Sequence, residues 1–184
     1  MSNKYTYQVL RDTTTDAVIK LTAAFDGTSG QEANNTRIQA NTLYGALDAN
    51  NVPLNTGLSK SNTALPYYGL QLTNCQYYCN MGQGTGSVEI FWNGGGANST
   101  QQYANSATIF HLNYNGEYGN EQQPAIFNNS SNSPTGDLGV YTLGAIANCS
   151  YTLVLSFRKD NAQYQRGQFN DPAAFNYGIY SLKP

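Results

Sequence analysis

The stretch Ser87–Asn93 is the feature that most constrains how this chain folds. Glycine-rich segments at 82–86 and 94–96 bound it on both sides, and glycine interrupts regular structure. Between them apolar and polar residues alternate, as in a β-strand with one face turned to a core. The predicted core face contains the only tryptophan of the chain and two β-branched residues, Val88, Ile90 and Trp92. We expect other strands to pack around this one.

The segment Tyr151–Lys159 shows the cleanest alternation in the chain. A strand here turns Tyr151, Leu153, Leu155 and Phe157 inward, and the residues between them outward. Similar patterns predict further strands in 5–11, 17–25, 67–79, 107–112 and 137–143, with a short candidate strand at 125–127. The segment 36–47 fits either a helix or a strand period, and we interpret it as a short strand that leads into a turn, with one helical turn as the alternative near Leu43. The apolar phase slips within 67–79, which predicts a bulge near Asn74.

At least seven short strands separated by Gly, Asn and Pro turns indicate an all-β fold, a β-sandwich of the jelly-roll kind with long loops. The longest of the expected surface loops is 48–66. We assign residues 1–162 to the sandwich and 163–184 to an irregular tail, which mixes aromatic residues with Gly and Pro. The tail is too short to form a core. It either covers its own sandwich or acts as an arm on a neighbouring subunit, through Phe169, Phe175, Tyr177 and Tyr180.

Charge limits the classes of partner. Only 11% of the residues are charged, the formal net charge is −2 and the isoelectric point is near 5.2. Nucleic-acid binding needs clustered Lys and Arg, and the sequence has no such cluster. No run of 18 apolar residues occurs, so we expect no membrane-spanning helix. No secretory signal is visible at the N-terminus.

The cysteines do not form a recognisable framework. Cys75, Cys79 and Cys149 are odd in number, and a strand would place the first two too far apart for a disulfide. A zinc site would also need His111, the only histidine. We therefore expect three free, mostly buried thiols, with no metal, no cofactor and no small-molecule ligand.

Enzyme chemistry finds little support in the sequence. A glycosidase needs two paired carboxylates, and the spacing of Glu32, Glu89, Glu117 and Asp137 pairs none of them. Glu89 is expected to be solvated on the outer face of its strand. No nucleophile elbow, phosphate-binding loop or dinucleotide fingerprint is present. We expect a non-enzymatic protein.

Tyrosine is abundant, with 15 residues, and several lie next to loops rich in Asn and Gln. Tyr67, Tyr68, Tyr77, Tyr78 and Tyr103 suit a carbohydrate-binding module, because tyrosine rings stack on sugars. The same side chains suit a protein interface. Tyr67 and Tyr68 are therefore interface candidates, and the two functions stay open.

A succession of segments resembles virion structural proteins of tailed phages, cyanophages among them. The segments that carry the resemblance are Gln8-Val9-Leu10-Arg11-Asp12 after Tyr5, Ala17-Val18-Ile19-Lys20-Leu21, Arg37-Ile38-Gln39 before Thr42-Leu43, Val88-Glu89-Ile90-Phe91-Trp92, Gly136-Asp137-Leu138, Tyr151-Thr152-Leu153 with Arg158-Lys159, Gln165-Arg166-Gly167-Gln168-Phe169 and Asp171-Pro172-Ala173-Ala174-Phe175.

This resemblance implies a β-sandwich built into a virus particle, a capsid cement or decoration protein or else a neck or tail component. It implies assembly in the bacterial cytoplasm with the major capsid protein or other virion proteins as partners. A homo-oligomer is expected, with a trimer as one candidate state. The resemblance supplies no catalytic residue.

Overall fold

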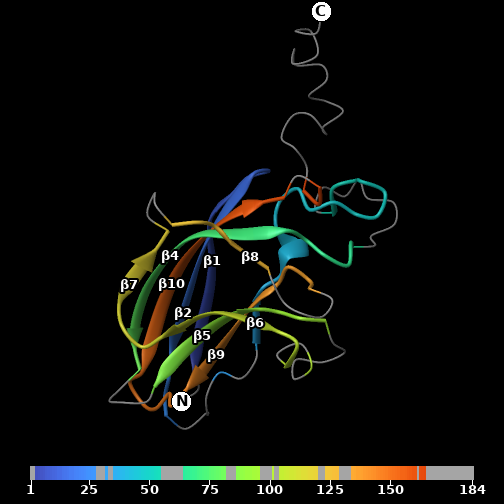
Figure 1. Cartoon of the computed structure of the whole chain (residues 1–184). Helices are drawn as coiled ribbons and strands as arrows, with labels where there is room; N and C mark the ends of the chain where they lie inside the picture. The colour runs from blue at the N-terminus through green and yellow to red at the C-terminus, as the bar shows by residue number, and fades with distance from the viewer. Residues whose placement is uncertain are drawn as a thin grey trace, which may run out of the picture.

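The computed structural model describes residues 3–27, 32, 35–54, 64–81, 86–95, 101, 104–119, 123–128, 134–160 and 162–164. Ten strands and one short 3-10 helix make up its named elements (Figure 1): β1 Lys4–Asp12, β2 Asp16–Ala24, β3 Asn35–Ile38, η1 Ala40–Thr42, β4 Leu70–Asn80, β5 Ser87–Trp92, β6 Ala107–Leu112, β7 Gly116–Tyr118, β8 Ile126–Phe127, β9 Leu138–Leu143 and β10 Ser150–Lys159. The all-β prediction is confirmed.

Two antiparallel sheets pack face to face (Figure 1). The larger sheet has the order β1-β2-β10-β4-β7, with β8 paired to the other end of β4, and the smaller has the order β3-β9-β5-β6. Only the β1–β2 and β5–β6 connections stay within one sheet, apart from the link from β7 to β8 beside β4. All other successive strands switch sheets. This interleaved order is that of a jelly roll, a sandwich built from two Greek keys.

Alternation along β10 explains its place at the centre of the larger sheet. Tyr151, Leu153, Leu155 and Phe157 are all buried, and the residues between them are only partly so. Its neighbour β2 buries Ala17, Ile19, Leu21 and Ala23 with the same period. Directly paired residues of antiparallel strands share a face. The register Leu155↔Ile19 and Leu153↔Leu21 therefore makes one continuous apolar layer.

Strand β4 carries the predicted bulge. Ser156 of β10 pairs with Asn74, and the next residue, Phe157, pairs with Leu72, so Thr73 is the extra residue. The bulge brings Leu72 and Cys75 to the same buried face although three positions separate them. The strand begins at Leu70, whereas the sequence had indicated a start at Tyr67.

Strand β5 is an interior strand, between β9 and β6. Val88, Ile90 and Trp92 lie in the core as predicted, each 0% exposed. The ring centroids of Trp92 and Phe157 lie 6.2 Å apart in an edge-to-face arrangement. Since Phe157 belongs to the other sheet, this contact packs the two sheets together. The opposite side of β5 is also buried, including Phe91, Asn93 and Glu89, and the prediction of a solvated Glu89 is wrong.

A second bulge, which the sequence did not indicate, lies in β6. Ile90 pairs with Phe110 whereas Phe91 pairs with Thr108, so Ile109 is an extra residue. The bulge reverses the alternation partway along the strand. Thr108 therefore shares a side with Glu89, to which it hydrogen-bonds, and does not share a face with Leu112.

Two residues that the sequence assigned to a surface loop and to the tail are buried in the structure. The 48–66 segment is not simply a surface loop, because Asp48 is fully buried and its carboxylate accepts the Asn50 and Val52 N–H groups at 2.7 and 2.9 Å. Tyr164, which the sequence placed in the tail, is fully buried in the sandwich. Its hydroxyl donates to the Ala40 carbonyl at 2.7 Å. The sandwich therefore extends at least to residue 164.

Candidate functional site: the outer face of the larger sheet

The outer face of the larger sheet is built from the positions that alternate with its buried residues. Its side chains form straight rows across the strands, because the register aligns them directly. One row reads Thr6, Thr22, Thr152 and Tyr78. Each row residue is at least partly exposed, and Tyr78 is 58% exposed. Among the described residues no element covers this broad face, which is rich in hydroxyl and amide groups.

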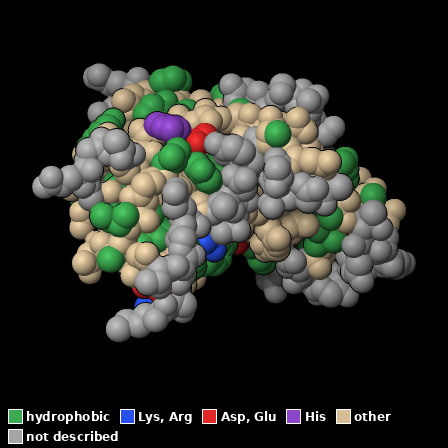
Figure 2. All heavy atoms as spheres, turned by 90° about the horizontal axis from the view of Figure 1, so that it is seen from below, with side chains coloured by type: hydrophobic (Ala, Val, Ile, Leu, Met, Phe, Trp, Pro, Cys, Tyr) green, Lys and Arg blue, Asp and Glu red, His purple; other side chains and the backbone are tan. Residues whose placement is uncertain are grey.

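Few charges interrupt this face. The next row reads Gln8, Lys20, Val154, Gln76 and Glu117, and the row beyond it reads Arg11, Val18, Ser156 and Asn74. Asn74 donates to the Glu117 carboxylate at 2.9 Å, so that charge is already engaged. Figure 2 views the molecule from below Figure 1, onto the end of the sandwich, and there too the coloured side chains include few acidic or basic ones.

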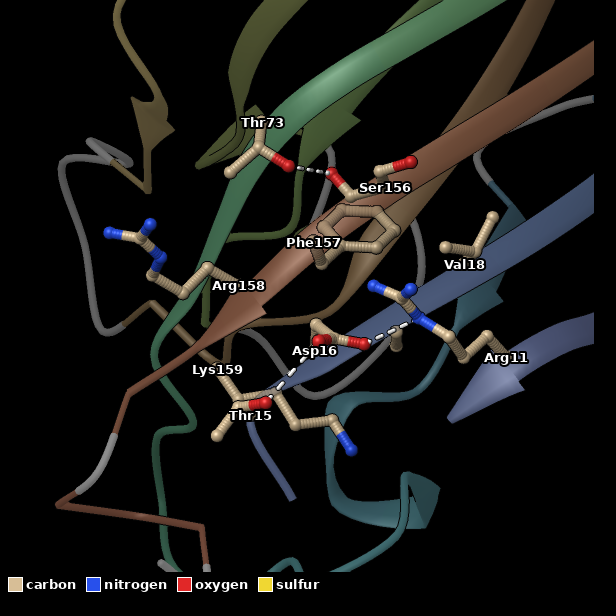
Figure 3. A pocket seen from close by; sticks show the side chains of 10 residues that line it. Arg11, Thr15, Asp16, Val18, Thr73, Ser156, Phe157, Arg158 and Lys159 are labelled. Carbon is tan, nitrogen blue, oxygen red and sulfur yellow. Dashed lines mark hydrogen bonds and ion pairs between the residues drawn. The ribbon is translucent and has the colours of Figure 1, made fainter. Parts of the chain in front are cut away.

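A hollow of about 610 Å³ lies at one end of the face (Figure 3). It forms where β1 and β2 meet in a tight turn and where the Thr73 bulge turns a hydroxyl toward β10; that hydroxyl donates to the Ser156 carbonyl at 3.0 Å. Arg11 lies on one side and pairs with Asp16 at 2.7 Å, and Arg158 lies on the other. The hollow presents hydroxyl, carboxylate and guanidinium groups, and it suits a polar group that can both donate and accept hydrogen bonds.

A buried lysine lies next to this hollow and fastens the end of the sheet. The Lys159 side chain is fully buried, and its ammonium group pairs with Asp12 and donates to the carbonyls of Thr13 and Tyr44 at 2.6 and 2.8 Å. It also lies 5.1 Å from the centre of the Tyr164 ring. Burial lowers the pKa of Lys159, while the hydrogen bond and charge of Asp12 oppose that shift. This cluster connects β10, the β1–β2 turn and the segment after η1.

A second buried polar cluster joins the opposite end of β10 to the smaller sheet. Glu32 is buried; one carboxylate oxygen pairs with Arg37 and the other accepts the Tyr151 hydroxyl at 2.7 Å. The Arg37 guanidinium lies 4.2 Å from the centre of the Tyr5 ring. Burial raises the pKa of Glu32, and the Arg37 charge and the hydrogen bonds only partly oppose it.

Glu32 should therefore give the protein a measurable pH dependence. Its pKa is higher in the folded than in the unfolded chain, so the folded state binds more protons in the window from about 4.5 up to the raised value. Its contribution to stability is full below that window and is lost as pH rises through it. We expect Glu32→Gln to lack this loss, so that stability relative to wild type improves from pH 4 to pH 8. Urea unfolding across this range measures it.

Glu117→Gln is the matched control, because Glu117 is exposed on β7. The difference between the pH profiles of the two variants isolates the effect of burying the carboxylate. If the Glu32→Gln difference stays flat, or turns against the variant as pH rises, burial does not dominate the titration of Glu32.

The structure places the predicted site residues unevenly. The six predicted core residues Val88, Ile90, Trp92, Leu153, Leu155 and Phe157 are all buried. Tyr67 is half-buried, while Tyr68 is 2% exposed, with its hydroxyl donating to the Leu47 carbonyl and accepting the Leu65 N–H. Tyr68 is therefore a core residue and not an interface residue. Phe169, Phe175, Tyr177 and Tyr180 lie outside the described residues.

The carboxylates considered for catalysis lie on different elements, each with its own partner. The Glu89 carboxylate on β5 lies 3.2 Å from Nε2 of His111 on β6. The Asp137 carboxylate accepts the Ala40 N–H at 2.8 Å. Glu32 and Glu117 have the partners given above. The three cysteines are free and buried, as expected. Burial raises the pKa of Cys75 to about 12 and that of Cys79 to about 11, so neither is a reactive thiolate near neutral pH.

Sequence reasoning missed both buried clusters. A signal for Lys159 was present, because it continues the inward positions 151, 153, 155 and 157 of β10. A lysine at such a position is buried only with partners, and these come from residues far away in the sequence, such as Asp12. Nothing in the local pattern marks Glu32.

A scan against protein-family models gives no match, and searches of curated proteins and of solved structures give none either. Within the described residues, no helix has the length and apolar character needed to cross a membrane.

Proposed function

We propose that this chain is a non-enzymatic structural subunit of a virus particle, a cement or decoration protein that binds the phage head. The observation that carries the proposal is the outer face of the larger sheet, where aligned rows of Thr, Gln, Ser and Asn side chains lie uncovered. Such a face offers many hydrogen-bonding groups on rigid strands. Interfaces of this polar, hydrated kind bind partners without a deep pocket.

The jelly-roll architecture is compatible with this role. Jelly rolls occur in viral capsid proteins and also in lectins, and a fold does not by itself imply a function. The resemblance of the sequence to phage virion proteins favours the first of these. The structural roles of Glu32, Glu89, Glu117 and Asp137 also support a non-enzymatic subunit. The major capsid protein is the proposed partner, and a neck or tail protein is the alternative.

Glycan binding is the second candidate, and one observation favours it. The Tyr78 ring is exposed on the outer face, and two amide side chains, Gln76 and Asn80, are exposed on the same side of β4. An exposed aromatic ring beside amide groups can stack on a sugar and bind its hydroxyls. The rows of the face extend far beyond Tyr78, however, and a surface of that width fits a protein better than one sugar.

The phage that encodes the chain provides the test. We expect mass spectrometry of purified particles to detect the protein, and cryo-EM to place the larger sheet against a head protein. Thr152→Arg puts a long charged side chain in the middle of the outer face, and we expect it to lower particle occupancy at least about tenfold. His111→Arg is the control, since the His111 side chain is 57% exposed on the other sheet and an arginine there can still pair with Glu89.

The alternatives give different results. Particles that lack the protein would overturn the virion proposal. Retention on a host polysaccharide with release by free sugar, lost in Tyr78→Ala, would establish the glycan function; we expect no retention above background. Equal occupancy of Thr152→Arg and His111→Arg would show that the protein attaches through another surface.

A further inference from the structure

Strand β1 forms an open edge of the larger sheet. It pairs with β2 on one side, and among the described strands none pairs with its other side. All residues from Lys4 to Arg11 are exposed, on both faces of the sheet. The backbone N–H and C=O groups along such an edge can pair with a further strand.

The other sheet edges are protected in ways that β1 is not. Strand β7 has three residues, β3 has four with an irregular register, and the bulge at Ile109 interrupts β6. Short edges and bulges are common means by which proteins prevent unwanted strand pairing, and charges are another. In β1 the only irregularity lies between Val9 and Arg11, and the regular stretch Tyr5–Val9 has no charged residue.

The inner side of β1 carries a row of large apolar side chains. Tyr5, Tyr7 and Val9 pair with Ala23, Leu21 and Ile19, which are buried, so the row continues the core layer of β2 outward. Yet these three side chains remain 36%, 46% and 44% exposed. A further strand beside β1 would cover both this row and the open backbone.

We propose that the occupant is β1 of a second copy of this chain, paired antiparallel about a two-fold axis at Tyr7. This register places Tyr7 against Tyr7, Tyr5 against Val9 and Thr6 against Gln8, each residue meeting one on the same face. Aromatic pairs and aromatic–β-branched pairs are favourable across antiparallel strands. Lys4 then meets Leu10, so no like charges face each other.

The charges at the ends of β1 disfavour the parallel, in-register arrangement. Parallel, in-register pairing would set Lys4 against Lys4 and Arg11 against Arg11, and like charges directly opposite each other are unfavourable. A ring such as a trimer would require β1 to pair with a different edge, and the other described edges are short or bulged. Self-pairing of β1 therefore gives a closed dimer with one sheet continuous through both subunits.

The oligomeric state of the purified chain tests this inference independently of any role in a virus particle. We expect sedimentation and light scattering to give a dimer, and Tyr7→Lys, which sets two ammonium groups together on the axis, to raise its dissociation constant at least about tenfold. Tyr78→Lys is the matched control: it replaces a tyrosine that is even more exposed, 58% against 46% for Tyr7, but lies on an interior strand, and it should remain a dimer. Circular dichroism and the unfolding midpoint verify that both variants fold.

Cysteine crosslinking tests the register and does not depend on the lysine variants. We expect Tyr7→Cys to crosslink with itself through a short bifunctional thiol reagent, and Tyr5→Cys to crosslink with Val9→Cys when the two proteins are mixed. Neither Tyr5→Cys nor Val9→Cys alone should do so efficiently, and the three native cysteines are buried. A monomeric wild type, or a dimer in which none of these positions crosslinks, would overturn the proposal.

Discussion

Asp12→Asn is expected to lower the free energy of unfolding by about 3–5 kcal/mol, because it leaves a buried lysine without its counter-charge. The Lys159 side chain is fully buried and that of Asp12 is 17% exposed, so solvent screens the pair only weakly. Asparagine has nearly the shape of aspartate, so the change opens no cavity. The carboxylate accepts the Lys159 ammonium on one oxygen and the Tyr44 N–H, at 2.9 Å, on the other, and asparagine offers an acceptor to only one of them. The loss therefore measures the missing charge together with one hydrogen-bond acceptor.

The neighbouring pair Arg11–Asp16 is a matched control in the same turn. Its side chains are 60% and 33% exposed, so solvent screens the interaction. Exposed ion pairs contribute about 0–1 kcal/mol, and Asp16→Asn should cost no more than that. Urea unfolding of both variants under identical conditions gives the comparison. Equal losses would mean that burial of Lys159 does not set the value of its ion pair.

The variant Lys159→Met completes the test. Met keeps most of the aliphatic stem but removes the charge, leaving the Thr13 and Tyr44 carbonyls without this donor. In Asp12→Asn combined with Lys159→Met, no buried charge remains unpaired. We expect the double variant to lose clearly less stability than the sum of the two single losses, by about 0.5–3 kcal/mol.

The strand pattern of this chain was predictable from sequence wherever one face alone is buried. In β10 the positions from Tyr151 to Phe157 alternate cleanly, and both the strand and its inward residues were predicted correctly. In β5 both faces are buried. The polar character of Glu89 therefore led to the wrong prediction that its side chain is solvated. Bulges are visible from sequence only when the apolar phase slips, as near Asn74 of β4; in β6 no such slip marks Ile109.

The candidate site was less accessible to sequence reasoning, because it depends on which strands become neighbours. The row of Thr6, Thr22, Thr152 and Tyr78 unites residues from four strands, and only the register brings them together. Tyr68 and Tyr78 look alike in the sequence, each within a Tyr-Tyr pair. Tyr68 is buried, and its hydroxyl bonds the backbone of Leu47 and Leu65, whereas Tyr78 is exposed on the outer face. This difference arises from tertiary packing.

Trp92→Ala is expected to cost about 3–5 kcal/mol, the range for deleting a large buried aromatic side chain. Trp92 is 0% exposed and contacts Phe157 across the layers, so the deletion leaves a cavity between the two sheets. Phe127→Ala is the control, because Phe127 is 59% exposed on β8. That change should alter the free energy of unfolding by only about 0.5 kcal/mol or less.

Trp92→Phe separates the contribution of ring volume from that of the indole N–H. Among the described residues, the buried Trp92 Nε1 has no hydrogen-bond acceptor, and a buried unpaired donor costs about 1–3 kcal/mol. Phenylalanine removes that donor and keeps an aromatic ring against Phe157. We therefore expect a loss of only about 1–2 kcal/mol, less than half that of Trp92→Ala. If Phe and Ala cost the same in urea unfolding, the indole N–H has an acceptor, and the tryptophan holds the sheets together through that hydrogen bond as well as through its packing.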